Sequence, residues 1–425
     1  MMSFARLRSS DVFSNVLARV GGLIALGIAT FIVARVGGPA AVGVYALLRV
    51  LVGLFGVLIS AGLPGAVTYF LAGASRSDPR LRPTIVAQAL VGGIAAAIIW
   101  LLATPVLEHT FLPTAGSAVV AWASVMVFTH LFVATAKSCN QGTGNLPGAN
   151  RVILLEDLMF LPAYALVYAF SVRGYAAIVA GLLVGDAAVA LFSWARLRRD
   201  GFFALSARPS MELARSIVNY GTRAQIGGVI GLLNLRLDFL LLGALAGPAA
   251  LGIYAVASKF AELLRLLPLA LTYVLYPKFT SDGPEVARAK AIALMPKTGG
   301  LTFGAALPLA LSAGWLLPVV YGSEFAGAVI PVYILLVGLA SEGFSSVATA
   351  YLYGIGRPGL NSFAMGAGLA VTVALDILLV PTYGATGAAV ASSASYITVT
   401  IVLALFFFRT NRSPQPERAP IGSLS

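Results

Sequence analysis

The nine residues GPAAVGVYA at positions 38–46 return almost unchanged as GPAALGIYA at positions 247–255. Seven of the nine positions are identical, and the other two exchange one aliphatic side chain for another. In each copy the Gly-Pro pair is expected to end one helix, and the small residues allow a tight turn before the next helix begins. The sequence therefore contains the same helix–turn–helix unit twice, with the two copies about half the chain length apart.

The composition is too apolar for a soluble globular protein of 425 residues. Hydrophobic residues make up 59% of the chain, charged residues 10%, and the mean hydropathy is +0.91, whereas soluble domains carry about 25% charged residues. One soluble core could not hide that much apolar surface, so lipid must cover it. The net charge of +12 comes from bases in short connections, which favours a membrane protein over a nucleic-acid-binding one.

Continuous apolar runs, each long enough to cross a bilayer, predict twelve spanning helices. Because the runs do not alternate between polar and apolar residues, helices are favoured over strands. The predicted spans are 13–36, 42–72, 84–107, 115–137, 150–171, 175–196, 216–246, 250–276, 291–317, 326–350, 359–380 and 385–408.

Lys and Arg gather in one set of connections, including those near 76–82, 196–215 and 278–290, whereas the opposite set holds Arg173 and otherwise Glu108 and Glu324. The positive-inside rule then places both termini in the cytoplasm. We expect a multi-pass protein of the cell membrane without a cleaved signal peptide. The single cysteine, Cys139, excludes an internal disulfide.

Two further pairs of segments match in the same order. SNVLARVGGLIALGIATFIVAR (14–35) aligns with RAQIGGVIGLLNLRLDFLLLGA (223–244), and QGTGNLPGAN (141–150) with YGIGRPGLN (353–361). Each half then has six spans, so the halves are parallel repeats around a shared central cavity. The predicted domains are two six-helix bundles, 1–205 and 206–409, followed by a disordered cytoplasmic tail, 410–425.

The order of these signals resembles the polysaccharide flippase branch of the superfamily that also contains multidrug and toxic compound extrusion transporters and lipid II flippases. The resemblance spans the whole chain and is carried by both Gly-Pro turns and by AGLPGAVTYFLA (61–72), LNLRLDFLLLG (233–243), YLYGIGRPGLN (351–361) and VPTYGATGAAVASSASY (380–396). It implies a transporter that moves polyprenyl-diphosphate-linked oligosaccharides between leaflets by alternating access, with a cationic cavity.

Charges at membrane depth are costly and usually face a cavity or a partner. The repeat aligns Arg49 with Ser258, the residue directly before Lys259. Each half therefore contributes one base at similar depth. Since Arg and Lys bind phosphate through charge-assisted hydrogen bonds, we predict substrate binding by Arg49, Lys259, Arg236, Arg35 and Arg265. The alternative is that Arg236 pairs with Asp238, and that Lys259 and Arg265 pair with Glu262.

Carboxylates within spans are candidates for carrying a coupling ion, H⁺ or Na⁺. We select Glu342 and Asp186 for that role, and expect Asp376 to lie near the outer surface. Pro64 and Pro268 fall within the second span of each half and are candidate hinges. No metal site is expected, because the two histidines are isolated, and no other cofactor is expected.

The leading function is therefore a flippase for polyprenyl-diphosphate-linked glycan in cell-surface polysaccharide biosynthesis, not an enzyme. We expect a monomer in membrane lipid without a nucleic-acid partner, and leave association with polysaccharide biosynthesis enzymes open. One alternative is a cation-coupled multidrug exporter, which would need an anionic or aromatic cavity. The other is a membrane polysaccharide polymerase or glycosyltransferase, for which the chain offers no large outer loop.

Overall fold

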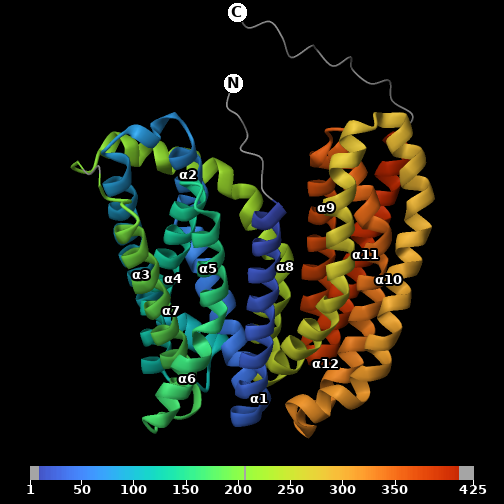
Figure 1. Ribbon diagram of the computed structural model, residues 1–425. Coiled ribbons are helices and arrows are strands. Elements are labelled where there is room, and N and C mark those ends of the chain that lie inside the picture. Colours follow the sequence, from blue (N-terminus) through green and yellow to red (C-terminus); the bar gives the residue numbers. More distant parts are fainter. Residues whose placement is uncertain (1–8, 205–206, 411–425) are drawn as a thin grey trace, which may run out of the picture.

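The computed structural model describes residues 9–204 and 207–410, and every regular element in that part is helical (Figure 1). Residues 411–425 of the predicted tail lie outside the described residues. Three short 3₁₀ turns are η1 (Ala74–Ser77), η2 (Glu262–Arg265) and η3 (Ser323–Ala328). The α-helices are α1 (Ser9–Ile59), α2 (Leu63–Ala72), α3 (Leu81–Phe111), α4 (Ser117–Gly142), α5 (Leu146–Leu158), α6 (Phe160–Ala169), α7 (Gly174–Arg199), α8 (Met211–Ala261), α9 (Leu266–Ser281), α10 (Pro284–Tyr321), α11 (Val329–Gly354) and α12 (Pro358–Arg409).

Three of these helices are each long enough for two passes. α1, α8 and α12 contain 51, 51 and 52 residues, about 75 Å if straight, against about 30 Å of hydrocarbon. Each is interrupted by one glycine with a left-handed φ: Gly38 (67°), Gly247 (79°) and Gly384 (51°). The described residues hold nine apolar stretches able to span, and the breaks divide α1, α8 and α12 between two passes each, which confirms the predicted twelve-helix architecture.

The passes form two lobes, which Figure 1 shows side by side. Helices α1 to α7 form the N-terminal lobe, and most of α8 with α9 to α12 forms the C-terminal lobe. Within these lobes, α1 and α8 lie at the interface and contact each other. The ribbons converge at the end where α1 and α8 turn back, here named the turn end. They diverge toward the end at which α1 begins and α12 ends, here named the terminal end.

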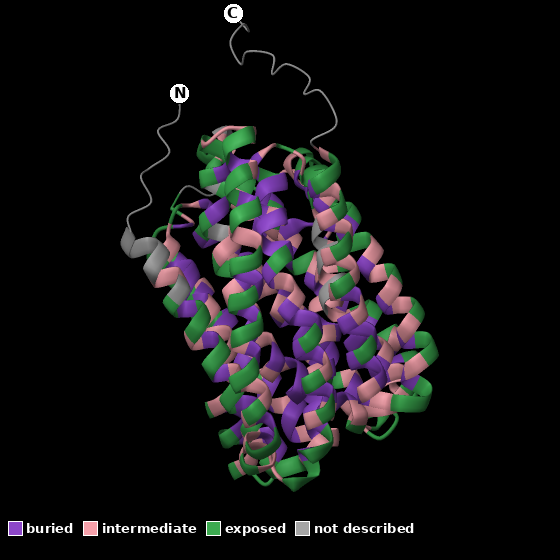
Figure 2. Cartoon of the chain, turned by 90° about the vertical axis from the view of Figure 1, so that its right-hand side faces the viewer, coloured by how far each residue is buried: buried purple, intermediate pink, exposed green. Residues whose placement is uncertain are grey.

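The outer surface is apolar along most of its length, as expected for contact with lipid. On α10 the side chains of Phe303, Leu307 and Leu311 are exposed at 61%, 54% and 84%, and their spacing of four residues places them on one face. Figure 2 shows exposed residues running the full length of such outer helices.

The two lobes repeat individual side-chain contacts as well as their chain path. Arg82 donates to the carbonyl of Phe202 at 2.7 Å and stacks 5.2 Å from its ring. Arg288 does the same with Phe407, at 3.0 and 5.0 Å. In each lobe, an arginine in the first turns of the third pass therefore holds the end of the sixth pass, as predicted for an internal repeat.

At the turn end the two repeated Gly-Pro motifs pack against each other. A Cβ atom added to Gly43 would lie 1.8 Å from the Pro248 carbonyl oxygen, and one added to Gly252 would lie 1.8 Å from the Pro39 carbonyl oxygen. Such reciprocal contacts are typical of a two-fold relation. The motif occurs twice because each copy needs glycine where the other copy's backbone touches it.

Both candidate hinge prolines follow a break in their helix. Pro64 lies in the first turn of α2, after α1 ends and the backbone passes through Gly62 at φ 74°. Pro268 lies in the first turn of α9, directly after η2. Because Pro64 stands at the start of α2, it removes no helical hydrogen bond there. Bending at these two positions stays a prediction.

Candidate functional site

A pocket of about 220 Å³ lies between the lobes and is bordered only by α1 and α8. Its charged lining residues are Arg49, Arg236 and Lys259, and its other lining residues are Leu26, Thr30, Val42, Tyr45, Ala46, Val50, Gly53, Leu232, Phe239 and Ala255. We name this space the cationic pocket. The structure thus brings together three of the five predicted binding residues, from three different helix passes.

Arg49 reaches the pocket from the second pass of α1. Its Nη2 lies 2.5 Å from Oδ1 of Asp157 on α5, and its Nη1 lies 3.4 Å from the Tyr45 hydroxyl. Its side chain is 29% exposed. Asp157 therefore orients the guanidinium without enclosing it, and part of the donor fork stays accessible from the pocket.

Arg236 and Lys259 share one carboxylate, Glu262. Lys259 Nζ lies 2.9 Å from Glu262 Oε2, whereas Arg236 Nη1 lies 3.7 Å from Oε1, too far for a hydrogen bond. Among the described residues, Arg236 Nη1 is buried without a hydrogen-bond partner. The expected alternative of an Arg236–Asp238 pair is wrong, because Asp238 instead accepts from Tyr254 Oη at 2.5 Å.

The three cations of the pocket do not have all their donors satisfied. Asp157 and Glu262 form ion pairs with them, but one guanidinium nitrogen of Arg236 has no hydrogen-bond acceptor among the described residues. A buried donor without an acceptor costs free energy, about 1–3 kcal/mol or more for a charged group. An anion with several oxygen atoms could supply an acceptor for this donor and for the accessible part of Arg49.

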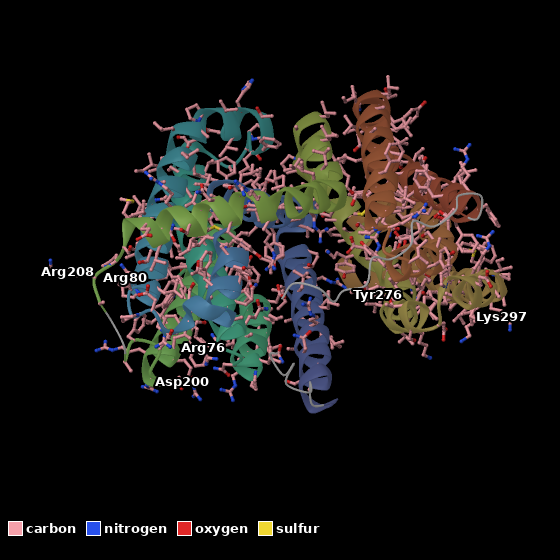
Figure 3. The ribbon with its side chains drawn as sticks, turned by 90° about the horizontal axis from the view of Figure 1, so that it is seen from above. Arg76, Arg80, Asp200, Arg208, Tyr276 and Lys297 are labelled. Carbon is pink, nitrogen blue, oxygen red and sulfur yellow. The ribbon has the colours of Figure 1, made fainter. Side chains whose placement is uncertain are left out.

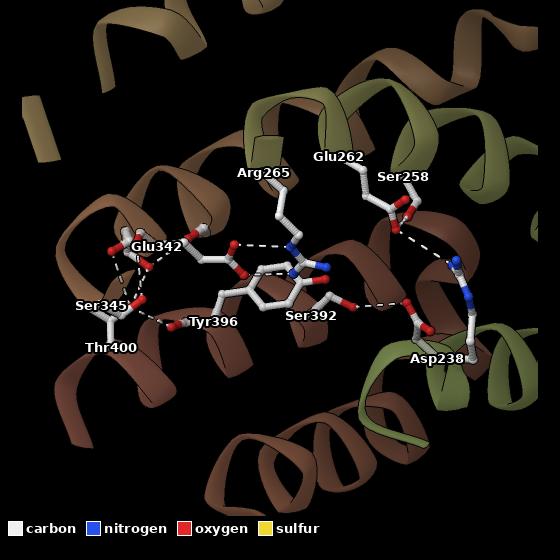
Figure 4. Close-up of polar contacts among 12 residues, drawn as sticks. Asp238, Ser258, Glu262, Arg265, Glu342, Ser345, Ser392, Tyr396 and Thr400 are labelled. Carbon is white, nitrogen blue, oxygen red and sulfur yellow. Dashed lines mark hydrogen bonds and ion pairs between the residues drawn. The ribbon is translucent and has the colours of Figure 1, made fainter. Parts of the chain in front are cut away.

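The other two predicted binding residues lie outside the pocket. Arg265 forms a two-point ion pair with Glu342, at 2.7 and 3.1 Å, over the ring of Tyr396 (Figure 4). Arg35 donates to the carbonyls of Val319 and Val320 near the C-terminal end of α10. Arg265 thus ties three helices of the C-terminal lobe together, and Arg35 links the two lobes at the turn end.

The candidate ion-coupling carboxylates occupy different environments. Glu342 is held by Arg265, and half-buried Asp186 on α7 forms no ion pair with a described residue. Asp376 on α12 is 0% exposed, and neither carboxylate oxygen has a hydrogen-bond partner among the described residues. The expectation that it lies near the outer membrane surface stays a prediction. Its position as the single acid of an apolar span was a signal for burial.

Histidine contributes no metal centre to the part of the chain that is described. His130 Nδ1 lies 3.8 Å from Glu156, which also pairs with Lys137 at 2.8 Å. Across the residues with known placement, no three His, Cys, Asp or Glu side chains are grouped as metal ligands.

Comparison with known proteins shows the family to which this chain belongs. Residues 32–330, most of the chain, match the family model described as polysaccharide biosynthesis protein. The chain belongs to the polysaccharide biosynthesis protein family. This confirms the resemblance to polysaccharide flippases that the repeated motifs indicate.

The curated relatives of this chain have low sequence identity to it. Over 202 residues, 46% of the chain, it is 23% identical to a protein of Haloferax volcanii named probable low-salt glycan biosynthesis flippase Agl15. Over 268 residues, 60% of the chain, it is 24% identical to the uncharacterized membrane protein MJ1068 of Methanocaldococcus jannaschii. The chain covers 42% and 52% of the lengths of these two relatives.

Proteins of known structure share this fold over nearly the whole length of the chain. The lipid II flippase MurJ in an inward closed conformation matches with a TM-score of 0.70 and 14% identity, covering 95% of this chain and 87% of its own. An inward-facing multidrug resistance MATE transporter of the MOP superfamily matches with a TM-score of 0.67 and 17% identity, covering 91% and 94%. The relatives with a named activity are flippases or transporters, not enzymes.

Proposed function

We propose that this protein moves polyprenyl-diphosphate-linked oligosaccharide across the cell membrane by alternating access. The observation that carries the proposal is the cationic pocket between the lobes, with Arg49, Arg236 and Lys259 around one space. A diphosphate must replace its water shell to enter the membrane, and two guanidinium forks with one ammonium supply charge-assisted hydrogen bonds for that. Membership of the polysaccharide biosynthesis protein family supports a glycan as the cargo.

The proposed orientation places the terminal end in the cytoplasm. Arg76, Arg80 and Arg208 lie around this end of the N-terminal lobe (Figure 3), in agreement with the positive-inside rule. The turn end, where the Gly-Pro motifs touch, would then face outward and be closed. The described conformation would load the head group from the cytoplasm, and release would require the two turns to separate.

Coupling to H⁺ or Na⁺ is part of the proposal. Asp376 is the best-placed carboxylate of the C-terminal lobe for this role, because a buried acid without a partner gains most from a bound proton or cation. In the N-terminal lobe Asp186 stays a candidate. Glu342 is a weaker one, because Arg265 already neutralises it.

Export of cationic drugs is the second candidate function. Asp157 and Glu262 beside the cationic pocket could accept a cation if their arginine and lysine partners moved away, and the fold is shared with a multidrug transporter. The two functions demand opposite charge in the pocket. They can therefore be separated by a single substitution that removes a base.

The test compares Lys259→Met with Lys297→Met, a matched control on the periphery of the C-terminal lobe (Figure 3). Proteoliposomes would report translocation of a fluorescent polyprenyl-diphosphate sugar, and of a cationic dye in parallel. The flippase proposal expects Lys259→Met to reduce glycan translocation at least tenfold, about 1.4 kcal/mol, while Lys297→Met stays near wild type. Unchanged glycan translocation, or dye transport that Lys259→Met accelerates, would refute it in favour of drug export.

A further inference from the structure

Two further spaces lie beyond the cationic pocket toward the terminal end. The first, about 250 Å³, is named the inner cavity and is bordered mainly by small and aliphatic residues, with Ser60, His130 and Gln225 as its polar members. The second, about 460 Å³, is named the side groove and lies between α1–α2, α3 and the first turns of α8. Ser60 borders both, so the two spaces adjoin.

The three spaces follow the same order along α1 and α8. On α1, Arg49 and Gly53 border the cationic pocket, and Gly56 and Ser60 follow at intervals of three or four residues, which places them on one helix face. Arg49 and Ser60 are about 16 Å apart along the helix. On α8 the order is Arg236, then Gln225, then Ile217 toward the terminal end.

The side groove is suited to hydrocarbon. No charged residue borders it. Three of its four polar lining residues, Ser60, Thr84 and Ser210, are hydrogen-bonded to nearby backbone. The fourth, Gln88, donates through Nε2 to the Ala214 carbonyl, and its Oε1 has no partner among the described residues. The rest of the lining is aliphatic, methionine or proline. A polar ligand would therefore find few free partners there.

The groove opens to the lipid-facing surface. Val91 and Met211 on its rim are 68% and 80% exposed. Val91 begins a stripe of exposed aliphatic residues on α3 that continues through Ile94 and Ile98, at helical spacing. Figure 3 shows the first turns of α8 lying across the N-terminal lobe at this end, where they cover the groove.

We propose that the side groove and inner cavity hold the polyprenyl chain of the amphiphilic substrate while its diphosphate occupies the cationic pocket. This inference rests on the proposed function, and its basis is continuity: one helix face of α1 runs from the phosphate-binding bases to an uncharged groove open to lipid. The tail enters laterally between α3 and α8. Oligosaccharide and tail are thereby separated before the head group crosses.

Gly62 and Gly221 border the inner cavity, and residues next to them in the chain, such as Ala61, border the side groove. A Cβ on Gly62 would lie 2.1 Å from the Gly221 carbonyl oxygen, and one on Gly221 would lie 2.4 Å from the Ala61 carbonyl oxygen. The backbones therefore touch without side chains between them. Parting of α8 from α2 at this contact joins the two spaces for the passage of the chain.

The experiment uses the full-length protein in nanodiscs and a C55 polyprenyl diphosphate that carries a diazirine on its chain. Cross-links are expected in residues 59–63, 84–92 and 209–218. Ala87→Trp fills the groove and Val91→Trp obstructs its exposed rim, so both are expected to lower this labelling at least about fivefold. Ile94→Trp, three residues further on the same helix but outside the groove lining, is the matched control and stays at wild-type labelling.

Inorganic pyrophosphate binding separates failure of the groove from failure of the proposed function. If pyrophosphate binds and Lys259→Met weakens it, the cationic pocket stands; unchanged C55 labelling in both tryptophan variants then overturns the groove alone. If pyrophosphate does not bind the wild type, the proposed function fails. Labelling of the groove by a diazirine phosphatidylglycerol that the C55 lipid does not displace would assign it to membrane lipid and overturn the inference.

Discussion

Closure of the turn end depends on two glycines, and Gly43→Ala tests this directly. The added Cβ would lie 1.8 Å from the Pro248 carbonyl oxygen, whereas carbon and oxygen in contact are about 3.3 Å apart or more. The obstacle is backbone on both sides, so no flexible side chain can yield. The two turns must separate by about 1.5 Å.

The energetic consequence follows from this forced separation. Overpacking a close contact costs about 1–3 kcal/mol, and here the cost falls only on the conformation in which the turns touch. If the protein alternates between two conformations, the equilibrium shifts about 5- to 150-fold toward the one with separated turns. Gly252→Ala, in the symmetric position, is expected to act in the same direction. The double variant should shift it by less than the sum, because the first separation relieves the second clash.

The assay is the rate at which a membrane-impermeant maleimide modifies a cysteine introduced at Val50, which borders the cationic pocket. In intact cells, labelling is expected to accelerate in the Gly43→Ala background by the factor just given, until it saturates. Gly27→Ala is the matched control, since a Cβ there meets nothing within 4 Å. Equal rates in Gly43→Ala and Gly27→Ala, with normal protein yield, would refute the reasoning.

Three further outcomes are expected. Glu342→Gln should lower the free energy of unfolding by about 2 kcal/mol, less than a fully buried pair because Arg265 is a quarter exposed; adding Arg265→Met should recover part of it. Gly338→Ala, whose Cβ would lie 2.6 Å from the Ser393 backbone, should lower the free energy of unfolding by about 1–3 kcal/mol. Thermal unfolding of the purified variants measures both effects. Cys139, which is fully buried, should react with maleimide only after unfolding.

Controls for these outcomes come from the same chain. Gly300→Ala should leave the unfolding temperature unchanged, because a Cβ there meets nothing within 4 Å. A Glu342→Gln variant as stable as wild type would show that the pair with Arg265 adds nothing to the lobe. Rapid labelling of native Cys139 would contradict its burial between α2, α3 and α4.

The sequence alone determined the number of passes and the internal repeat. A bilayer requires about 20 apolar residues in a helix for each crossing, so hydropathy shows where the passes lie. The repeated Gly-Pro motifs were visible because Gly38 and Gly247 need a left-handed φ. The sequence also placed bases at matching depth in both halves, since that depends only on distance along a helix.

Only the tertiary structure decided which of those bases face one pocket. Helical spacing shows which residues share a face, but which face meets which neighbour depends on how helices from distant parts of the chain pack. Arg236 thus forms its ion pair with Glu262 and not with Asp238, and Arg265 pairs with Glu342, 77 residues away. The contact between the two Gly-Pro turns could not be predicted either, because the similarity of two stretches of sequence does not show that they touch in the fold.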